Sequence, residues 1–195
     1  MSTRFDILPT PLADLRVLQR KPLGDSRGYL ERLFCLQELA EILAGRHIIQ
    51  INHTLTTRRG TVRGMHFQNP PHAETKFVSC LRGEVFDVAV DLRSGSSTFL
   101  KWHGEILSAE NHRTLVIPEG FADGFQALCD GCEMLYFHTD AYHATAEGEV
   151  NALDPLLAIK WPLEVTTLSD RDLAHPWLDA EFKGIEVECR DAKHD

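Results

Sequence analysis

Gly60-Thr61-Val62-Arg63-Gly64-Met65-His66-Phe67-Gln68 is the stretch that decides the fold, because it sets a basic residue, a tight glycine and a histidine between two predicted strands. We interpret this run as the floor of an active site. A histidine alone indicates little, since most histidines are surface residues or satisfied core residues. Two later stretches look complementary to it: residues 117–125, which contain Asp123, and residues 135–142, which contain Tyr136 and Tyr142.

Length and composition indicate one globular domain spanning residues 1–195. Domains commonly run to about 200 residues, and a chain of 195 residues can bury a sizeable core. Hydrophobic residues make up 43% and charged residues 25% of the chain, which argues against disorder. The formal net charge of -9 disfavours nucleic acid and anionic membranes as partners. An anionic ligand would therefore have to meet a local basic pocket.

The sequence predicts a cytoplasmic protein with reduced cysteines. No stretch approaches the roughly 20 apolar residues of a membrane span, and the first residues lack the apolar core of a signal peptide. The five cysteines are an odd number, which favours free thiols. Cys129-Asp-Gly-Cys132 has CxxC spacing, and its Asp-Gly centre favours a tight hairpin turn over a redox or zinc site.

Short apolar runs separated by turn residues indicate a mainly β fold. At roughly 8–12-residue spacing they are typical of a sandwich or barrel, with predicted strands at 47–56, 61–68, 75–82, 84–92, 98–107, 113–118, 124–129, 133–139 and 157–159.

Prolines in residues 1–22 indicate a peripheral strand, and residues 24–28 form a predicted turn. Helices are predicted over 36–43 and from the cap Ser169 to before Pro176, with a loose charged tail at 186–195. Polar and apolar residues alternate within the predicted strand at 84–92. This alternation slightly favours an Asp87 side chain that faces solvent over an Asp87 side chain that points into the mouth of the barrel.

Two half-motifs resemble those of the cupins. Gly60 and His66, with five residues between them, match the opening of the first cupin motif, and Pro118-Glu-Gly-Phe-Ala-Asp123 has the shape of the second. The resemblance implies a cupin-type double-stranded β-helix, or jelly-roll barrel, with a few short peripheral helices. Gln68 and Asp123 stand where metal-binding histidines are expected, and His66 with Asp123 makes a poor site for a borderline-soft divalent metal. We therefore expect no metal and no other cofactor.

Acid/base chemistry remains available to such a barrel. A proton can be removed from a carbon next to a ketone if a histidine base faces one side of the substrate, a tyrosine faces the other, and a cation steadies the enolate oxygen. His66, Tyr136 and Lys76 can supply these groups. Asp172 can stand behind the histidine, fix its tautomer and raise its basicity.

Many motifs from about residue 24 to residue 176 together resemble the dTDP-4-dehydrorhamnose 3,5-epimerase family, the metal-free cupin-type enzymes of nucleotide-deoxysugar synthesis. They follow the family's order at residues 25–31, 50–53, 62–68, 76–78, 83–93, 107–111, 117–122, 135–136, 142 with 147, 154–155, 159–162 and 168–172.

The resemblance implies an isomerase that inverts C3, C5 or both in a nucleotide-linked 4-keto-6-deoxyhexose. His66 would be the base and Asp172 its partner, Tyr136 rather than Tyr142 the acid on the opposite face, and Lys76 the cation near the C4 oxygen. Contacts to the nucleotide diphosphate sugar, some of them across the interface of a homodimer with exchanged N-terminal strands, would come from Arg27, Glu31, Gln50, Asn52, Arg63, Tyr142, Glu147 and Arg171.

This chain departs from the family at two positions beside the expected substrate. Asp123 replaces a substrate-contacting histidine, and Ile51 replaces an aspartate. A carboxylate only accepts hydrogen bonds; it would repel a phosphate but bind a sugar hydroxyl. The chemistry therefore looks retained and the substrate altered. Two alternatives stay open: a non-catalytic nucleotide-sugar-binding protein and a metal-dependent cupin enzyme.

Overall fold

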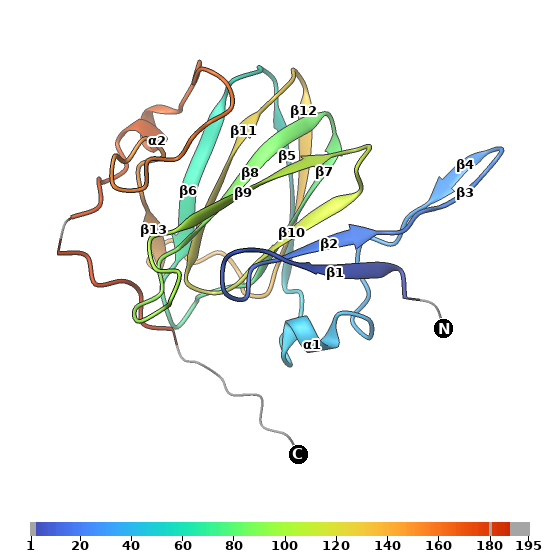
Figure 1. The fold of residues 1–195 in the computed structure, drawn as a ribbon, viewed down its shortest axis with the longest axis horizontal. Coiled ribbons are helices and arrows are strands. Elements are labelled where there is room, and N and C mark those ends of the chain that lie inside the picture. Colours follow the sequence, from blue (N-terminus) through green and yellow to red (C-terminus); the bar gives the residue numbers. More distant parts are fainter. Residues whose placement is uncertain (1–2, 180, 188–195) are drawn as a thin grey trace.

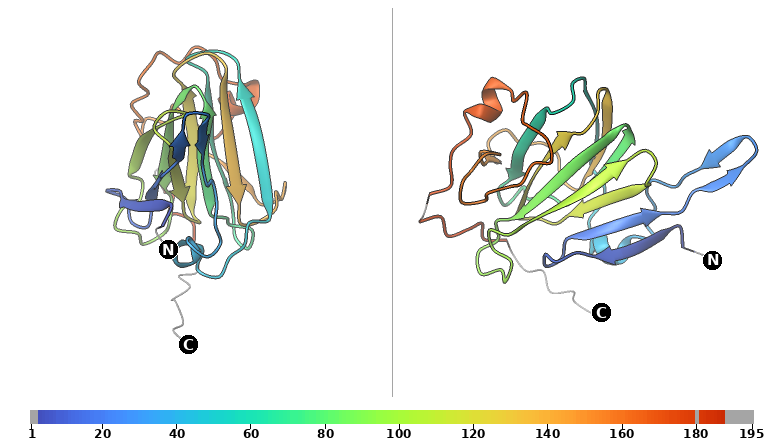
Figure 2. Two further views of the ribbon diagram at one scale, coloured as in Figure 1. Left: turned by 90° about the vertical axis from the view of Figure 1, so that its right-hand side faces the viewer. Right: turned by 45° about the horizontal axis from the view of Figure 1, so that its top comes forward.

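Two antiparallel β-sheets pack face to face in a jelly-roll-like arrangement (Figures 1 and 2). The structure is a computed structural model and describes residues 3–179 and 181–187. One sheet has six strands, in the order β1 (Phe5–Pro9), β2 (Arg16–Arg20), β10 (Arg113–Ile117), β7 (Lys76–Arg82), β12 (Cys132–His138) and β5 (Gln50–Thr56). The other has five, in the order β13 (Glu147–Glu149), β6 (Val62–Gln68), β11 (Phe121–Ala127), β8 (Glu84–Asp91) and β9 (Trp102–Ser108).

Peripheral elements are few and short. A hairpin of β3 (Leu23–Asp25) and β4 (Gly28–Leu30) projects away from the sandwich (Figure 1), and the helices are α1 (Ala40–Leu43) and α2 (Asp170–Leu173). The predicted mainly β fold with a few short helices is confirmed. Within the described ranges, no helix is both long and apolar enough to cross a membrane.

The predicted strands between residues 47 and 139 are confirmed, with shifted ends. The largest shift is at β9, which begins at Trp102 because Leu100 adopts a positive φ of 59° and its N–H bonds back to the Asp91 carbonyl at 2.8 Å. The strand predicted at 157–159 does not form, whereas β13 was not predicted. The N-terminal segment contributes two paired strands rather than one, and the predicted turn at 24–28 is the tip of the β3–β4 hairpin.

The predicted helices are both shorter than expected. Residues 36–43 are helical only over α1, because Leu39 at the N-cap offers no side-chain hydrogen bond to the first turn. At the other end Ala44 is already left-handed, one residue before the predicted stop at Gly45. The predicted cap at Ser169 is confirmed, since its hydroxyl accepts a hydrogen bond from the Asp172 N–H at 3.0 Å. From residue 188 on, the predicted loose tail lies outside the described residues.

Both faces of the five-stranded sheet are buried. This explains why consecutive residues in its strands are apolar instead of alternating with polar ones. One core cluster lies between the sheets and includes Val85, Ala89 and Phe125. A second cluster lies on the outer face, where residues from the C-terminal third cover Val62 and Val88. The expectation that Asp87 faces solvent is wrong, because neither face of β8 is open to water; Asp87 is 1% exposed.

A β-bulge in β6 places two functional candidates on the same face. His66 pairs with Asp123, but the register then shifts, so that Gly64 pairs with Gly124 and Arg63 with Phe125. In a regular strand, residues three apart point to opposite faces, and an extra residue cancels that alternation. Arg63 and His66 therefore both face the space between the sheets, while Met65 packs in the outer cluster.

Glycine is required where the bulge meets the neighbouring strand. Gly64 has φ of +120°, and a Cβ there would lie 2.6 Å from the Gly124 Cα and 2.8 Å from the Asp123 carbonyl oxygen. Both contacts are with backbone atoms, which cannot rotate away as a side chain can. Only a residue without a Cβ permits this close approach of β6 and β11.

The turn between β11 and β12 carries the chain from one sheet to the other. The predicted tight hairpin turn at Cys129–Cys132 is wrong, since residues 128–131 form a bend and β12 pairs with β5 and β7 rather than with β11. The Cys129 and Cys132 sulfur atoms are 3.5 Å apart, longer than a disulfide of about 2.05 Å. All four cysteines in the described part of the chain are free.

Replacing Gly64 with alanine tests the bulge. We expect Gly64→Ala to lower the free energy of unfolding by about 3 kcal/mol or more, from backbone strain and overpacking together. Gly131→Ala is the matched control: Gly131 also has a positive φ, of 70°, but nothing lies within 4 Å of its added Cβ. It should cost only about 1–2 kcal/mol. Urea denaturation measures both, and equal losses would contradict the steric role of Gly64.

Candidate active site

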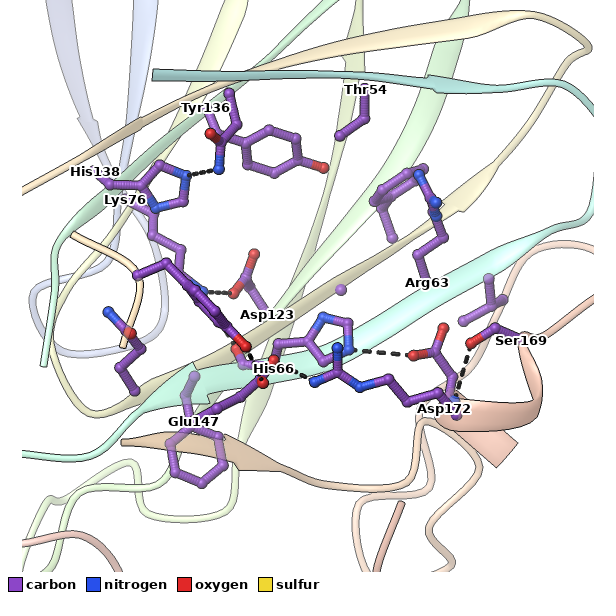
Figure 3. A pocket seen from close by; sticks show the side chains of 18 of the residues that line it. Thr54, Arg63, His66, Lys76, Asp123, Tyr136, His138, Glu147, Ser169 and Asp172 are labelled. Carbon is purple, nitrogen blue, oxygen red and sulfur yellow. Dashed lines mark hydrogen bonds and ion pairs between the residues drawn. The ribbon is translucent and has the colours of Figure 1, made fainter. Parts of the chain in front are cut away.

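A cavity of about 610 Å³ opens between the two sheets, a volume in the usual range for a small-molecule site (Figure 3). The six-stranded sheet, the five-stranded sheet and α2 all line it. Most of the residues predicted from sequence meet here: Gln50, Asn52, Arg63, His66, Lys76, Asp123, Tyr136, Tyr142, Glu147, Arg171 and Asp172.

His66 and Asp172 form a hydrogen-bonded pair on one side of the cavity. His66 Nε2 lies 3.2 Å from Asp172 Oδ1. Burial raises the pKa of Asp172, but the hydrogen bond and charge of His66 and the bond from Ser169 outweigh it, so the pKa lies below its usual range. The ionised carboxylate therefore accepts a hydrogen bond from Nε2–H, which leaves Nδ1 as the ring nitrogen that can take up a proton.

Tyr136 lies on the opposite sheet. It projects from β12 toward the cavity, whereas His66 projects from β6 (Figure 3). Loss of solvation and the nearby carboxylates of Asp87 and Asp123 raise the pKa of Tyr136 well above its usual value. The phenol is therefore protonated near neutral pH and can donate a proton from the side facing the His66 imidazole.

A buried ion pair joins the two sheets beside these groups. Lys76 Nζ on β7 lies 2.5 Å from Asp123 Oδ1 on β11, and both residues are buried. Burial lowers the pKa of Lys76, but the negative charges of Asp123 and Glu74 raise it by more, and the net shift is upward. Lys76 is therefore a fixed ammonium inside the cavity, and Asp123 is its counterion.

Asp87 lies near the same ion pair without a partner of its own. Neither carboxylate oxygen has a hydrogen-bond partner in the part of the chain that the structure describes. Burial first, and then the charge of Asp123, raise the pKa of Asp87 well above its usual value, although Lys76 acts in the opposite direction. These effects favour the neutral acid over the carboxylate.

A second group of polar residues surrounds the opening of the cavity. Arg171 pairs with Glu147 and donates to Glu149 Oε1 at 2.7 Å. Tyr142 donates through its hydroxyl to Glu147 at 2.8 Å and through its backbone N–H to Gln50 at 3.0 Å. These contacts hold the ring of Tyr142 and the guanidinium of Arg171 along one edge of the opening.

Two predicted binding residues lie elsewhere in the chain. Arg27 sits on the projecting β3–β4 hairpin, with its side chain 87% exposed and paired with Asp25. Glu31 pairs with Arg20 at 2.9 Å and with His112 at 2.8 Å. Neither residue lines this cavity in the single chain.

Two titratable residues that line the cavity were not predicted from the sequence. Glu74 accepts a hydrogen bond from His138 Nδ1 at 2.8 Å and lies 3.7 Å from Lys76 Nζ. His138 is two residues after Tyr136 on the same strand, and Glu74 is two residues before Lys76. The period-two alternation of a strand would have placed His138 beside Tyr136, whereas Glu74 precedes β7 and carries no such signal.

The cavity brings together a histidine on one sheet with a carboxylate of α2 behind it, and a tyrosine and an ammonium group on the other sheet, which are the groups that proton transfer requires. The sequence profile of the dTDP-4-dehydrorhamnose 3,5-epimerases matches residues 9–180. A dTDP-4-dehydrorhamnose 3,5-epimerase of Shigella flexneri is 41% identical over 181 residues, which cover 91% of this chain and 99% of the relative. The chain belongs to the dTDP-4-dehydrorhamnose 3,5-epimerase family.

Solved structures agree with this assignment. The dTDP-6-deoxy-D-glucose-3,5-epimerase RmlC of Legionella pneumophila, in complex with dTDP-4-keto-L-rhamnose, superposes with a TM-score of 0.86 at 40% identity, covering 94% of this chain and 99% of that one. ChmJ, a 3'-monoepimerase of Streptomyces bikiniensis in complex with dTDP-quinovose, superposes with a TM-score of 0.81 at 30% identity, covering 87% and 86% of the two chains.

Asp87→Asn tests the unpartnered acid through the pH dependence of stability. The folded state holds a proton on Asp87 that the unfolded state releases above about pH 4, so this residue destabilises the folded protein as the pH rises, by up to about 1.4 kcal/mol per unit. Asp87→Asn should remove that decline in urea denaturation between about pH 5 and 8.

Asp91→Asn is the matched control on the same strand. Its buried carboxylate binds Arg93, Ser96 and Thr98, which lower its pKa despite burial, so its stabilising effect is present at neutral pH and lost as the pH falls. Asp91→Asn should therefore destabilise the protein at neutral pH. A decline with pH that persists in Asp87→Asn would show that Asp87 is ionised when folded.

Proposed function

We propose that this chain epimerises a nucleotide-linked 4-keto-6-deoxyhexose of the dTDP-4-dehydro-6-deoxyglucose type, inverting C3, C5 or both in deoxysugar biosynthesis. The observation that carries the proposal is the placement of His66 and Tyr136 on opposite sheets that face one cavity. Inversion requires that a proton leave one face of a carbon and return to the other. A base and an acid on the same side would only exchange the proton.

The residues allow a balanced proton-transfer sequence. His66 Nδ1 takes the proton from the carbon next to the C4 ketone, and the electron pair of the broken C–H bond moves to the C4 oxygen as an enolate. The ammonium of Lys76 stabilises that oxygen, and Asp172 stabilises the imidazolium. Tyr136 then donates its proton to the opposite face of the carbon. Solvent restores the proton to Tyr136 and removes one from His66.

The nucleotide diphosphate part of the substrate fits the opening of the cavity. Arg63 and Arg171 supply guanidinium groups there, whose paired N–H donors match phosphate oxygens. The ring of Tyr142 can stack on the base of the nucleotide. Gln50, Asn52 and Glu147 can form hydrogen bonds beside it. Asp123 lines the same cavity and can accept a hydrogen bond from a sugar hydroxyl with the capacity that Lys76 leaves free.

The proposal includes a homodimer of single cupin-type domains in the cytoplasm. Strand β5 lies at a sheet edge, and exposed Ile51 and Leu55 on it give that edge an apolar surface. β1 and β2 pair within their own chain, so the projecting β3–β4 hairpin, which carries Arg27, is the segment that reaches toward a partner. The free thiols of the described cysteines support a reducing compartment.

Solvent-deuterium exchange tests the assignment of base and acid. With dTDP-4-keto-6-deoxyglucose in deuterium oxide, the wild type should incorporate deuterium at C3 or C5, and His66→Ala should lower the rate by about 10²–10⁴-fold because the base is lost. Tyr136→Phe should retain exchange at His66 but block inversion. Nuclear magnetic resonance of the sugar follows both.

His103→Ala is the control, since His103 lies on β9 with Glu105 and outside the cavity. It should exchange like the wild type. Binding of the nucleotide sugar without any exchange in the wild type would instead identify a non-catalytic binding protein. Exchange that survives in His66→Ala would overturn the assignment of the base.

A metal-dependent reaction at His66 and Asp123 is disfavoured by Lys76. Its ammonium is the direct partner of the Asp123 carboxylate, and a divalent cation at that oxygen would be repelled at close range. Gln68, the other residue at an expected ligand position, is engaged as well: its amide donates to the His72 and Ala141 carbonyls.

A further inference from the structure

His175 is a buried histidine that the proposed reaction does not use. Its side chain is 1% exposed, and neither ring nitrogen has a hydrogen bond to any residue that the structure describes. Nε2 points toward two carboxylates, lying 3.5 Å from Asp172 Oδ1 and 3.5 Å from Glu149 Oε1. A buried polar group without a hydrogen-bond partner is unusual, and a bound ion is one way to satisfy it.

Three potential metal-binding atoms converge at this position. Asp172 Oδ1 is 3.2 Å from His66 Nε2 and 3.5 Å from His175 Nε2, and the three atoms all lie within 4.8 Å of one another. The two rings meet edge to face, with centroids 5.1 Å apart. In a tetrahedral zinc site with bonds of about 2.0–2.1 Å, neighbouring ligand atoms are about 3.3 Å apart. Two of the three separations already match that spacing.

We propose that His66, Asp172 and His175 form a binding site for a divalent ion of the Zn²⁺ class. Two imidazole nitrogens and one carboxylate oxygen are a favourable donor set for zinc, and the fourth position is left to water. Glu149 Oε1 lies close to His175 but already accepts two hydrogen bonds from Arg171. The surrounding carboxylates of Glu147, Glu149 and Asp172 outnumber that guanidinium, so the local field favours a cation.

The site is separate from the ligand positions of the two cupin half-motifs. It shares His66 with them but uses neither Gln68 nor Asp123. Asp172 and His175 come from α2 and the residues directly after it, and Ser169 holds the backbone of Asp172 in place. The ion therefore lies behind His66, on the side away from Nδ1.

Occupancy of this site inhibits proton transfer, a consequence that rests on the proposed function. The ion replaces the proton on His66 Nε2, which is released to solvent, and the cation withdraws electron density from the ring. Nδ1 then becomes a weaker base, and Asp172 is no longer free to stabilise an imidazolium. Zinc is thus an inhibitor of this enzyme rather than its cofactor.

Zn²⁺ titration of the full-length protein by calorimetry tests the site directly, without substrate. The wild type should bind one Zn²⁺ per chain at this position, and His175→Asn should weaken that binding tenfold or more. His143→Asn is the matched control, because His143 belongs to the second described cluster, with His72 and Asp140. It should leave the affinity of the site at His66 unchanged.

Two calorimetric results would overturn the zinc site: no saturable Zn²⁺ binding by the wild type, or binding that is lost in His143→Asn but kept in His175→Asn. If His175→Asn does not fold, as judged by its thermal unfolding, the ¹⁵N resonances of the His66 and His175 rings in the wild type decide. Both should shift when Zn²⁺ is added, and unchanged resonances would reject the site.

Inhibition is measured separately, by deuterium exchange with and without Zn²⁺. Zinc binding with no exchange activity under any condition would refute the proposed function and leave the site intact. Full exchange at saturating Zn²⁺ would refute the inhibitory role.

Discussion

The close approach of the Gly64 and Gly124 backbones is the constraint on which the rest of the site depends. It permits the bulge that turns Arg63 and His66 to the same face of β6. Without the extra residue, one of these side chains would enter the outer core among Val62 and Met65. The placement of the His66 imidazole and the Arg63 guanidinium in one cavity therefore derives from the absence of two Cβ atoms.

The charges in the cavity are set by the same packing. Burying an ion costs several kcal/mol, and the Lys76–Asp123 pair is tolerable because each charge meets the other directly. Burial, and then the charge of Asp123, raise the pKa of Asp87, so a third ionised group beside this pair is disfavoured. Asp123 thus helps to keep Lys76 charged, while the raised pKa values of Tyr136 and Asp87 disfavour further negative charge in the cavity.

Much of the fold and site could be predicted because the motif residues lie on strands with clear turn signals. Asp87 was misplaced because alternation assumes that one face of a strand meets water, whereas segments distant in sequence cover both faces of β8. The crossing between sheets at Cys129–Cys132 has the same local signature as a hairpin. His175 belongs to no motif, and only the folding of the C-terminal segment brings it to Asp172. Arg27 and Glu31 lie outside the cavity of the single chain, and the sequence of one chain does not place a partner.

The Lys76–Asp123 pair also links the two sheets. The chain crosses between the sheets at both ends of the sandwich: at Gly83 and residues 128–131 at one end, and at residues 69–75, 118–120 and 139–146 at the other. Lys76 and His138 lie at the second end. The Lys76–Asp123 pair therefore adds an electrostatic link where peptide segments already join the sheets. A substrate oxygen that draws Lys76 toward itself competes with Asp123 for one ammonium group, so binding is coupled to this link between the sheets.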